Sequence, residues 1–131
     1  MQLDTVTLPS DLLWKNEFEW NQAVQSHART LSGAIEIQTA ANLYGRPIRL
    51  EGGDDGGWIT RATALAIRAL EADPTKIMTL SGLNDEAPLS VMFDRSNGSA
   101  FESQMILRWA QPGADTWYSC ALRLITVEPP T

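Results

Sequence analysis

The chain has 131 residues, and 10 Lys and Arg against 16 Asp and Glu give it a net charge of −6 at pH 7. This length suits one domain with its own hydrophobic core, and the 44% apolar content excludes a disordered chain. The acidic balance disfavours specific nucleic-acid binding and attachment to an anionic membrane. Because the chain has one cysteine, no readable secretion signal and no apolar run of bilayer length, we expect a soluble protein without an internal disulfide.

The first 20 residues are expected to form an N-terminal arm, followed by a single domain over residues 21–131. Acidic residues and Pro9 accompany a short amphipathic stretch in this segment. Its apolar residues are too near the chain end to start a core, and tryptophan is enriched at the centres of interfaces. An alternative is that Trp14 folds back onto its own domain. The expected subunit-interface residues are Leu8, Leu12, Leu13, Trp14, Phe18, Trp20, Trp109 and Trp117.

Alternating apolar residues predict two strands after the arm. Ile35 and Ile37 share one face of the first strand, and Ile48 and Leu50 share one face of the second. The intervening residues 42–46 contain Asn and Gly, which are typical of turns. The sequence therefore predicts that these two strands pair as a hairpin.

One helix is predicted within residues 58–72. Residues 51–57, with four glycines and three acids, precede it and are expected to form an exposed, projecting loop. Pro74 ends the helical pattern. The apolar face expected from the 3.6-residue period consists of Trp58, Ala62, Leu65, Ala66, Ala69 and Leu70.

Four apolar stretches follow the helix, at residues 76–80, 88–93, 100–109 and 115–127, and are separated by turn-forming sequences. The last is apolar on both faces, which is typical of a strand that is central or lies at an interface. The fold class is therefore α+β, mainly β: a single-domain curled sheet or split barrel of about seven strands with one helix. The expected core contains Ile35, Ile37, Ile48, Leu50, Leu65, Leu70, Val91, Phe93, Leu122 and Leu124.

Carboxylates are the first candidates for chemistry. Glu51, Asp54 and Asp55 could supply oxygen ligands to a divalent cation, but their spacing does not fit an EF-hand, and a solvated loop is the favoured interpretation. Glu17 and Glu19 could share a strand face as a glycosidase pair. With 16 acids in the chain, such proximity also arises without function.

His27 and Cys120 are the other candidates. His27 has no neighbouring carboxylate to orient it as a base, and Cys120 lies in an apolar stretch that predicts a buried, inert thiol. No nucleotide-binding loop, zinc motif or nucleophile elbow occurs. The sequence therefore predicts no catalytic residue, no metal and no cofactor, and we expect that the protein is not an enzyme.

Three segments carry a resemblance to a known family: LPSDLLWKNEFEW, GRPIRLEGGDDGGWITRATALAIRAL and TWYSCALRLITVEPP. Together they resemble small tail and baseplate proteins of tailed bacteriophages, whose tail-tube fold is a barrel-like sheet with one helix. The resemblance implies stacked rings around a channel, with residues 1–20 and the loop 51–57 gripping neighbouring subunits. A net charge of −6 is compatible with a channel that passes DNA, because like charges repel phosphate.

The expected function is thus that of a structural virion component of the tail, which forms a ring at or near the baseplate or tail tip and is assembled in the host cytoplasm. Its expected partners are further copies of itself and other tail proteins. Two alternatives stay open. One is a tail-completion or head–tail joining protein; the other is a small hydrolase or carbohydrate-binding module, in which tryptophans stack on sugars.

Overall fold

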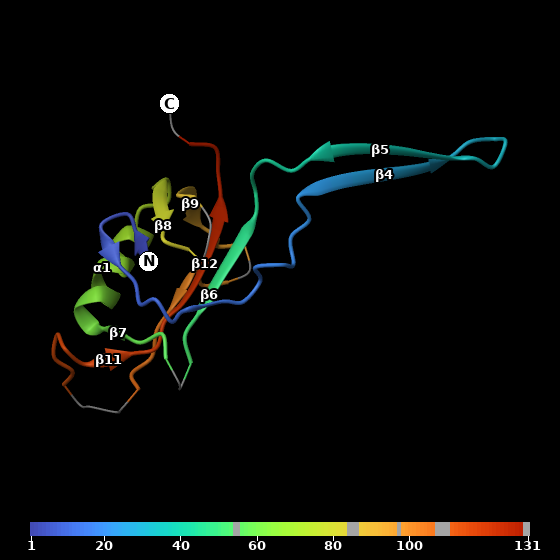
Figure 1. Ribbon diagram of the computed structural model, residues 1–131. Helices are drawn as coiled ribbons and strands as arrows, with labels where there is room; N and C mark the ends of the chain where they lie inside the picture. Colours follow the sequence, from blue (N-terminus) through green and yellow to red (C-terminus); the bar gives the residue numbers. More distant parts are fainter. Residues whose placement is uncertain (54–55, 84–86, 97, 107–110, 130–131) are drawn as a thin grey trace.

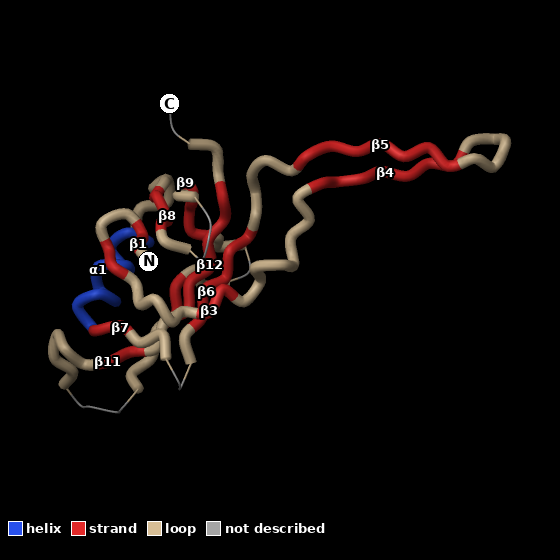
Figure 2. Tube along the Cα trace, in the orientation of Figure 1, coloured by secondary structure: helices blue, strands red, loops and turns tan. Residues whose placement is uncertain are grey.

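The computed structural model describes residues 1–53, 56–83, 87–96, 98–106 and 111–129. In these residues the fold is mainly β with one helix, as the sequence predicts. A curled, open sheet forms the body, and a long hairpin projects away from it (Figure 1). Figure 2 shows the same division, with the helix on the body.

The main sheet contains eight strands, and all of its pairings are antiparallel. It remains open, so a curled sheet rather than a closed barrel is observed. Seven strands form a continuous path, and β10 (Phe101–Glu102) pairs with β12 beside it. The path runs β2 (Val6–Thr7), β1 (Gln2–Leu3), β8 (Met78–Ser81), β9 (Leu89–Phe93), β12 (Ala121–Thr126), β6 (Pro47–Glu51) and β3 (Leu13–Trp14).

Strand β12 is central, as its two apolar faces predict. It pairs with β6 along Ala121 to Ile125 and with β9 along Leu124 to Thr126. Leu122 and Leu124 are fully buried on one face, in the core that also contains Ile48 and Leu50. The alternating pattern therefore assigned the inner face of this strand correctly.

Helix α1 (Arg61–Glu71) confirms the predicted helix, but its buried face differs from the predicted one. Thr60 caps the helix by accepting a hydrogen bond from the Thr63 amide. Ala64 and Ile67 are buried, whereas Leu65 is 48% exposed. Trp58 lies before the helix, so it could not define the helical face, and Ile67 does so instead.

The predicted hairpin between residues 35–38 and 47–51 is wrong. Strand β5 (Ile35–Ala41) pairs with β4 (Ala23–Arg29) over seven residue pairs, and β6 pairs with β12 and β3. Ile35 and Ile37, predicted to be core residues, are consequently exposed. Alternation shows which residues share a face of a strand, but not whether another element covers that face.

The N-terminal segment is part of the body rather than a separate arm. Strands β1, β2 and β3 all lie in the main sheet, and Leu3 and Val6 are buried in the core. The Leu8 amide donates to the Met1 carbonyl, and the Lys15 amide donates to that of Arg49. Residues 1–14 therefore fold with the domain from which the sequence analysis had separated them.

A small second sheet pairs β7 (Ile59–Thr60) with β11 (Trp117–Tyr118) beside the start of the helix. In the segment before β7, predicted as an exposed, projecting loop, Gly53 is exposed, whereas the described residues on either side of it are partly or fully buried. Gly57 is buried, and the Gly53 amide donates to the Gly56 carbonyl. Asp54 and Asp55 lie outside the described residues.

Candidate functional site

The hairpin β4–β5 is the most exposed element of the structure. Every residue of both strands is exposed, and no strand other than β4 and β5 pairs with them in the described chain. Its tip is closed by the Thr30 amide, which donates to the Ala34 carbonyl at 2.9 Å. A turn at Gly33, with a φ of 87°, lies within this tip. The hairpin thus stands free of the body along its length (Figures 1 and 2).

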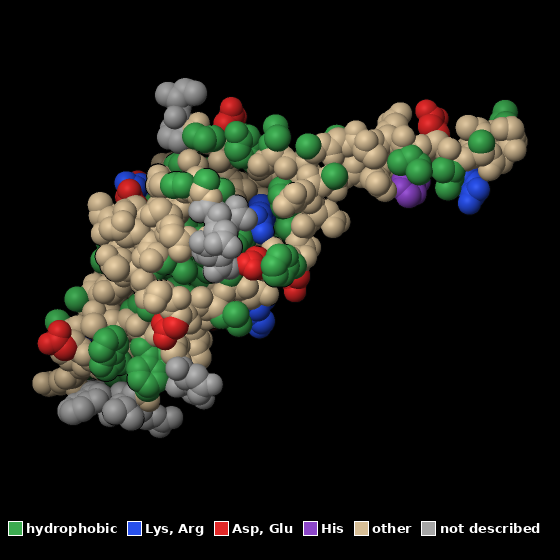
Figure 3. Space-filling model, in the orientation of Figure 1, with side chains coloured by type: hydrophobic (Ala, Val, Ile, Leu, Met, Phe, Trp, Pro, Cys, Tyr) green, Lys and Arg blue, Asp and Glu red, His purple; other side chains and the backbone are tan. Residues whose placement is uncertain are grey.

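This element carries little charge for a surface structure. Arg29 and Glu36 are the only Lys, Arg, Asp or Glu residues within 23–41, and the space-filling view shows a largely uncharged hairpin (Figure 3). Val24, Leu31, Ile35 and Ile37 are all exposed on it. Its strands contain no Pro, no Lys and no break in the pairing register, which are the usual protections of an edge strand. Such an element is suited to pairing with another chain.

The local sequence patterns do not identify this hairpin as a site. They predict contacts at residues 1–20 and at the loop 51–57, and they predict that Ile35 and Ile37 are core residues. The low density of charges in 23–41, in a chain in which 20% of residues are charged, was the available signal. That signal does not separate a buried strand from an uncovered one, so only the structure reveals the hairpin.

The predicted interface residues divide into four groups. Leu8, Leu12 and Trp14 are buried in the chain's own core, so the prediction that they contact another subunit is wrong. Trp20 is partly buried. Trp109 lies outside the described residues. The exposed members are Leu13 at 63%, Phe18 at 93% and Trp117 at 52%.

Arg46 connects the segment around Trp14 to the body through ring contacts and a hydrogen bond. Its guanidinium carbon lies 4.5 Å from the centre of the Trp14 ring and 5.7 Å from that of Trp20. Its Nη2 also donates to the carbonyl of Glu17 at 2.8 Å. Cation–π contacts of this kind stabilise a partly buried aromatic cluster. The alternative that Trp14 folds back onto its own domain is therefore the correct one.

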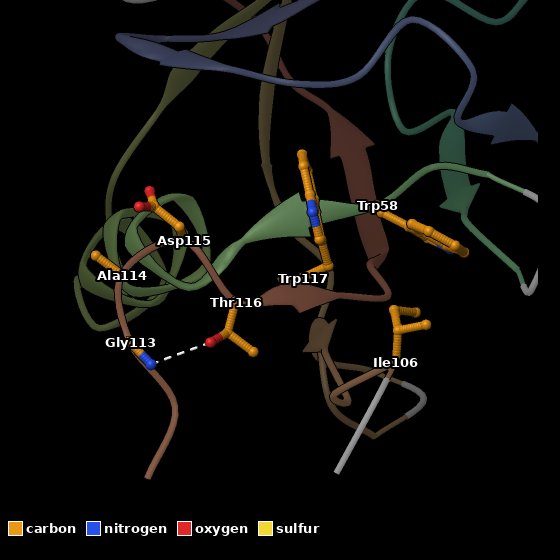
Figure 4. A pocket seen from close by; sticks show the side chains of 7 residues that line it. All are labelled: Trp58, Ile106, Gly113, Ala114, Asp115, Thr116 and Trp117. Atoms are coloured by element: carbon orange, nitrogen blue, oxygen red, sulfur yellow. Dashed lines mark hydrogen bonds between the residues drawn. The ribbon is translucent and has the colours of Figure 1, made fainter. Parts of the chain in front are cut away.

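An aromatic cavity of about 510 Å³ lies beside the small sheet of β7 and β11. In Figure 4, Trp58 and Ile106 project to one side of Trp117, and Asp115 lies on its other side near the helix. The Trp58 Nε1 donates to the Gly53 carbonyl at 2.8 Å, which fixes that ring. The lining is mostly apolar, and among the described residues that line the cavity there is no nucleophile–base pair.

Of the carboxylate candidates for chemistry, the structure describes Glu17, Glu19 and Glu51 but not Asp54 and Asp55. Glu17 and Glu19 lie in a turn rather than on a strand, so the predicted shared strand face is wrong. Glu51 accepts a hydrogen bond from Lys15 at 3.3 Å and lies 3.7 Å from the Arg49 Nε. Within the described ranges, no three His, Cys, Asp or Glu side chains are grouped to hold a metal ion.

The two remaining candidates are also separate. His27 is exposed on β4, where its Nε2 lies 3.1 Å from the Gln25 Oε1. Cys120 is buried, as predicted, and desolvation raises the pKa of its thiol to about 12. The thiolate, which is the nucleophilic form, is thus strongly disfavoured at neutral pH.

A second groove, of about 350 Å³, runs between α1 and the strands β10 and β11. Two arginines of the helix line it, together with apolar and hydroxyl-bearing side chains. The Arg61 Nη1 donates to the Tyr118 hydroxyl at 2.7 Å. The full lining is Arg61, Ala64, Leu65, Arg68, Glu71, Phe101, Ser103 and Tyr118.

Comparisons of the chain with protein-family models, with curated proteins and with solved structures found no match. In the described part of the chain, no helix has the length and apolar character needed to cross a membrane.

Proposed function

We propose that this protein is a structural subunit of a bacteriophage tail, forming a ring at or near the baseplate or tail tip. The observation that carries the proposal is the free-standing hairpin β4–β5, all of whose residues are exposed. A two-stranded hairpin alone in water is at best marginally stable. Its exposed aliphatic side chains and unpaired edges are explained if further copies of the chain cover them.

The two edges of the hairpin support a ring rather than a two-fold dimer. The outer edges of β4 and β5 both present backbone N–H and C=O groups without a partner strand in the described chain. A two-fold dimer joins one edge to its own copy and leaves the other edge free. Head-to-tail pairing of β5 with the neighbour's β4 uses both edges in every copy, and closure of the ring leaves none.

The phage assignment rests on the resemblance of the sequence segments quoted above and on the mainly β fold with one helix. Tail completion and head–tail joining use the same kind of ring assembly, so they remain the nearest alternative positions. In each case the partners are other copies of this chain and neighbouring tail proteins. No catalytic step is part of this proposal.

Excision of the hairpin tests the proposal. The Asn42 amide donates to the Gln22 carbonyl at 2.8 Å, and the Asn42 Nδ2 donates to the Asn21 carbonyl at 2.7 Å. The ends of the hairpin are therefore adjacent, and residues 23–41 can be replaced by a two-residue Asn-Gly turn. We expect a folded chain with nearly unchanged thermal stability that no longer assembles.

The measurements are thermal melting by circular dichroism, sedimentation velocity of the purified chain, and incorporation into tails in a complementation assay. Leu43→Ser, at an exposed leucine outside the hairpin, is the matched control and should assemble normally. An excised chain that still assembles would contradict the proposal. If the excised chain unfolds, the hairpin contributes to the stability of the body.

The aromatic cavity favours a second candidate function, binding of a carbohydrate. Exposed tryptophan rings beside polar groups suit the apolar faces and hydroxyls of a sugar, and Trp117 lies beside Thr116 and Asp115. Glycan-array binding by the wild type that is lost in Trp117→Ala and kept in Leu13→Ala would support it. Absence of binding by the wild type would remove it.

A further inference from the structure

The groove between α1 and the strands β10 and β11 is cationic at two points and apolar between them. Arg61 and Arg68 are seven residues apart, so they lie on one face of the helix about 10 Å apart along its axis. Leu65 lies between them and is half exposed, and Phe101 lines the groove from β10. An apolar floor with a positive charge near each end is unusual on a chain with a net charge of −6.

Neither arginine is neutralised by a carboxylate in the described chain. Glu71, the one acid that lines the groove, pairs with Arg95 at 2.8 Å. Arg61 is held by the hydroxyl and ring of Tyr118, which carry no charge. It also stands in the first turn of α1, where the helix dipole disfavours a cation and no acid is present. The groove therefore favours an anionic group with an apolar neighbour.

The chain itself carries such a pair in the turn after β3. Phe18 is 93% exposed, which makes it the most exposed aromatic residue of the described chain, and the next residue is the exposed acid Glu19. The Glu19 amide donates to the Asn16 carbonyl, so the turn holds these two side chains at the surface. A phenylalanine side chain gains strongly from burial, and the groove of about 350 Å³ has room for one ring.

We propose that the Phe18–Glu19 turn of one copy of this chain docks in the groove of a second copy. The ring of Phe18 lies against Leu65 and Phe101, and the carboxylate of Glu19 pairs with Arg68, because Arg61 is already held by Tyr118. The turn and the groove are different surfaces of the chain, so the contact is head-to-tail and repeats from copy to copy. This inference rests on the proposed assembly function, and it names a second contact in addition to the hairpin.

Disulfide trapping between two single variants tests the contact. Phe18→Cys and Leu65→Cys are purified separately, mixed under assembly conditions and oxidised mildly. Both positions are exposed, whereas the native Cys120 is buried and does not compete. We expect a mixed disulfide dimer at about tenfold the yield obtained from Leu43→Cys mixed with Leu65→Cys. Equal yields in the two mixtures would overturn the proposal.

A charge exchange provides an independent measurement. Arg68→Glu should weaken self-association about tenfold in sedimentation equilibrium, because it places a like charge opposite Glu19. Glu19→Arg in the same chain should restore most of that loss. Failure of the double variant to recover would contradict the ion pair, since both residues are exposed and neither change disturbs the core.

The two proposals fail in different ways. If excision of the hairpin abolishes assembly but the Phe18–Leu65 disulfide does not form in the intact chain, the structural function stands and this contact is wrong. If the chain does not associate at all, both the trapping and the charge exchange are negative, and the proposed function fails with the inference.

Discussion

Leu122 and Leu65 are chemically identical side chains in opposite environments. Leu122 is fully buried on the central strand, whereas Leu65 is half exposed on the outer face of α1. Leu122→Ala leaves a cavity in the core and should lower the free energy of unfolding by about 2–5 kcal/mol. Leu65→Ala should lower it by less than about 1 kcal/mol, because little buried surface is lost.

Urea denaturation followed by tryptophan fluorescence measures both changes, with the wild type as the reference. Similar losses in the two variants would show that α1 presents a different face to the core. The stability of the Leu65 variant also bears on the docking proposal, because Phe18 of a second copy can contact Leu65 only if Leu65 is exposed.

Arg46 illustrates how one residue decided the position of the N-terminal segment. The sequence places Trp14 and Trp20 among acids near the chain end, which suggested that they bind another subunit. The structure places Arg46 against both rings, and Trp14 becomes part of the core. This contact joins residues more than 25 positions apart, so local sequence patterns do not reveal it.

Gly57, in the glycine-rich segment before β7, is packed closely against its neighbours. Gly57 has a φ of 73°, and a Cβ atom built there would lie 2.6 Å from the Gly52 Cα and 3.0 Å from a methyl group of Leu12. Gly57→Ala should therefore lower the free energy of unfolding by about 1–3 kcal/mol through strain and overlap. Thermal melting by circular dichroism measures the effect.

Gly53→Ala is the matched control for this segment. A Cβ atom at Gly53 meets nothing within 4 Å, and its backbone is outside the left-handed region. The change should be within about 0.5 kcal/mol of the wild type. Equal destabilisation by the two variants would show that the segment responds to lost flexibility and not to the close approach of Gly52 and Gly57.

At the scale of the whole molecule, the body and the hairpin have different physical characters. The body buries its apolar residues in one core beneath the main sheet and α1. The hairpin exposes four large aliphatic residues and carries one positive and one negative charge. The body therefore has a packed core, whereas no other described element covers the hairpin. We expect this combination in a subunit whose hairpin is covered in an assembly.

The charged residues of the chain are concentrated in the body and are scarce in the hairpin. Of the 26 Lys, Arg, Asp and Glu residues, only Arg29 and Glu36 lie in 23–41. Surfaces that meet other protein chains are depleted of charge at their centres, whereas surfaces in water carry it. The hairpin therefore has the composition of an interface core even though it is exposed in the isolated chain.

The sequence by itself determined the elements that depend on local patterns. The helix, the strands β8, β9 and β12, the central place of β12 and the burial of Cys120 all follow from apolar periodicity and turn residues, and the structure confirms them. These features depend on residues within a few positions of each other. The mainly β fold class with one helix follows from their order along the chain.

The tertiary structure alone decided which strands pair and which faces are covered. Ile35 and Ile48 have the same alternating pattern, yet Ile35 lies on the free hairpin and Ile48 lies in the core. The difference arises because β6 pairs with β12, about 75 residues later, while β5 pairs with the neighbouring β4. The pairing of distant strands depends on the summed packing of the whole core, and so the candidate interface, unlike the fold class, emerges only in three dimensions.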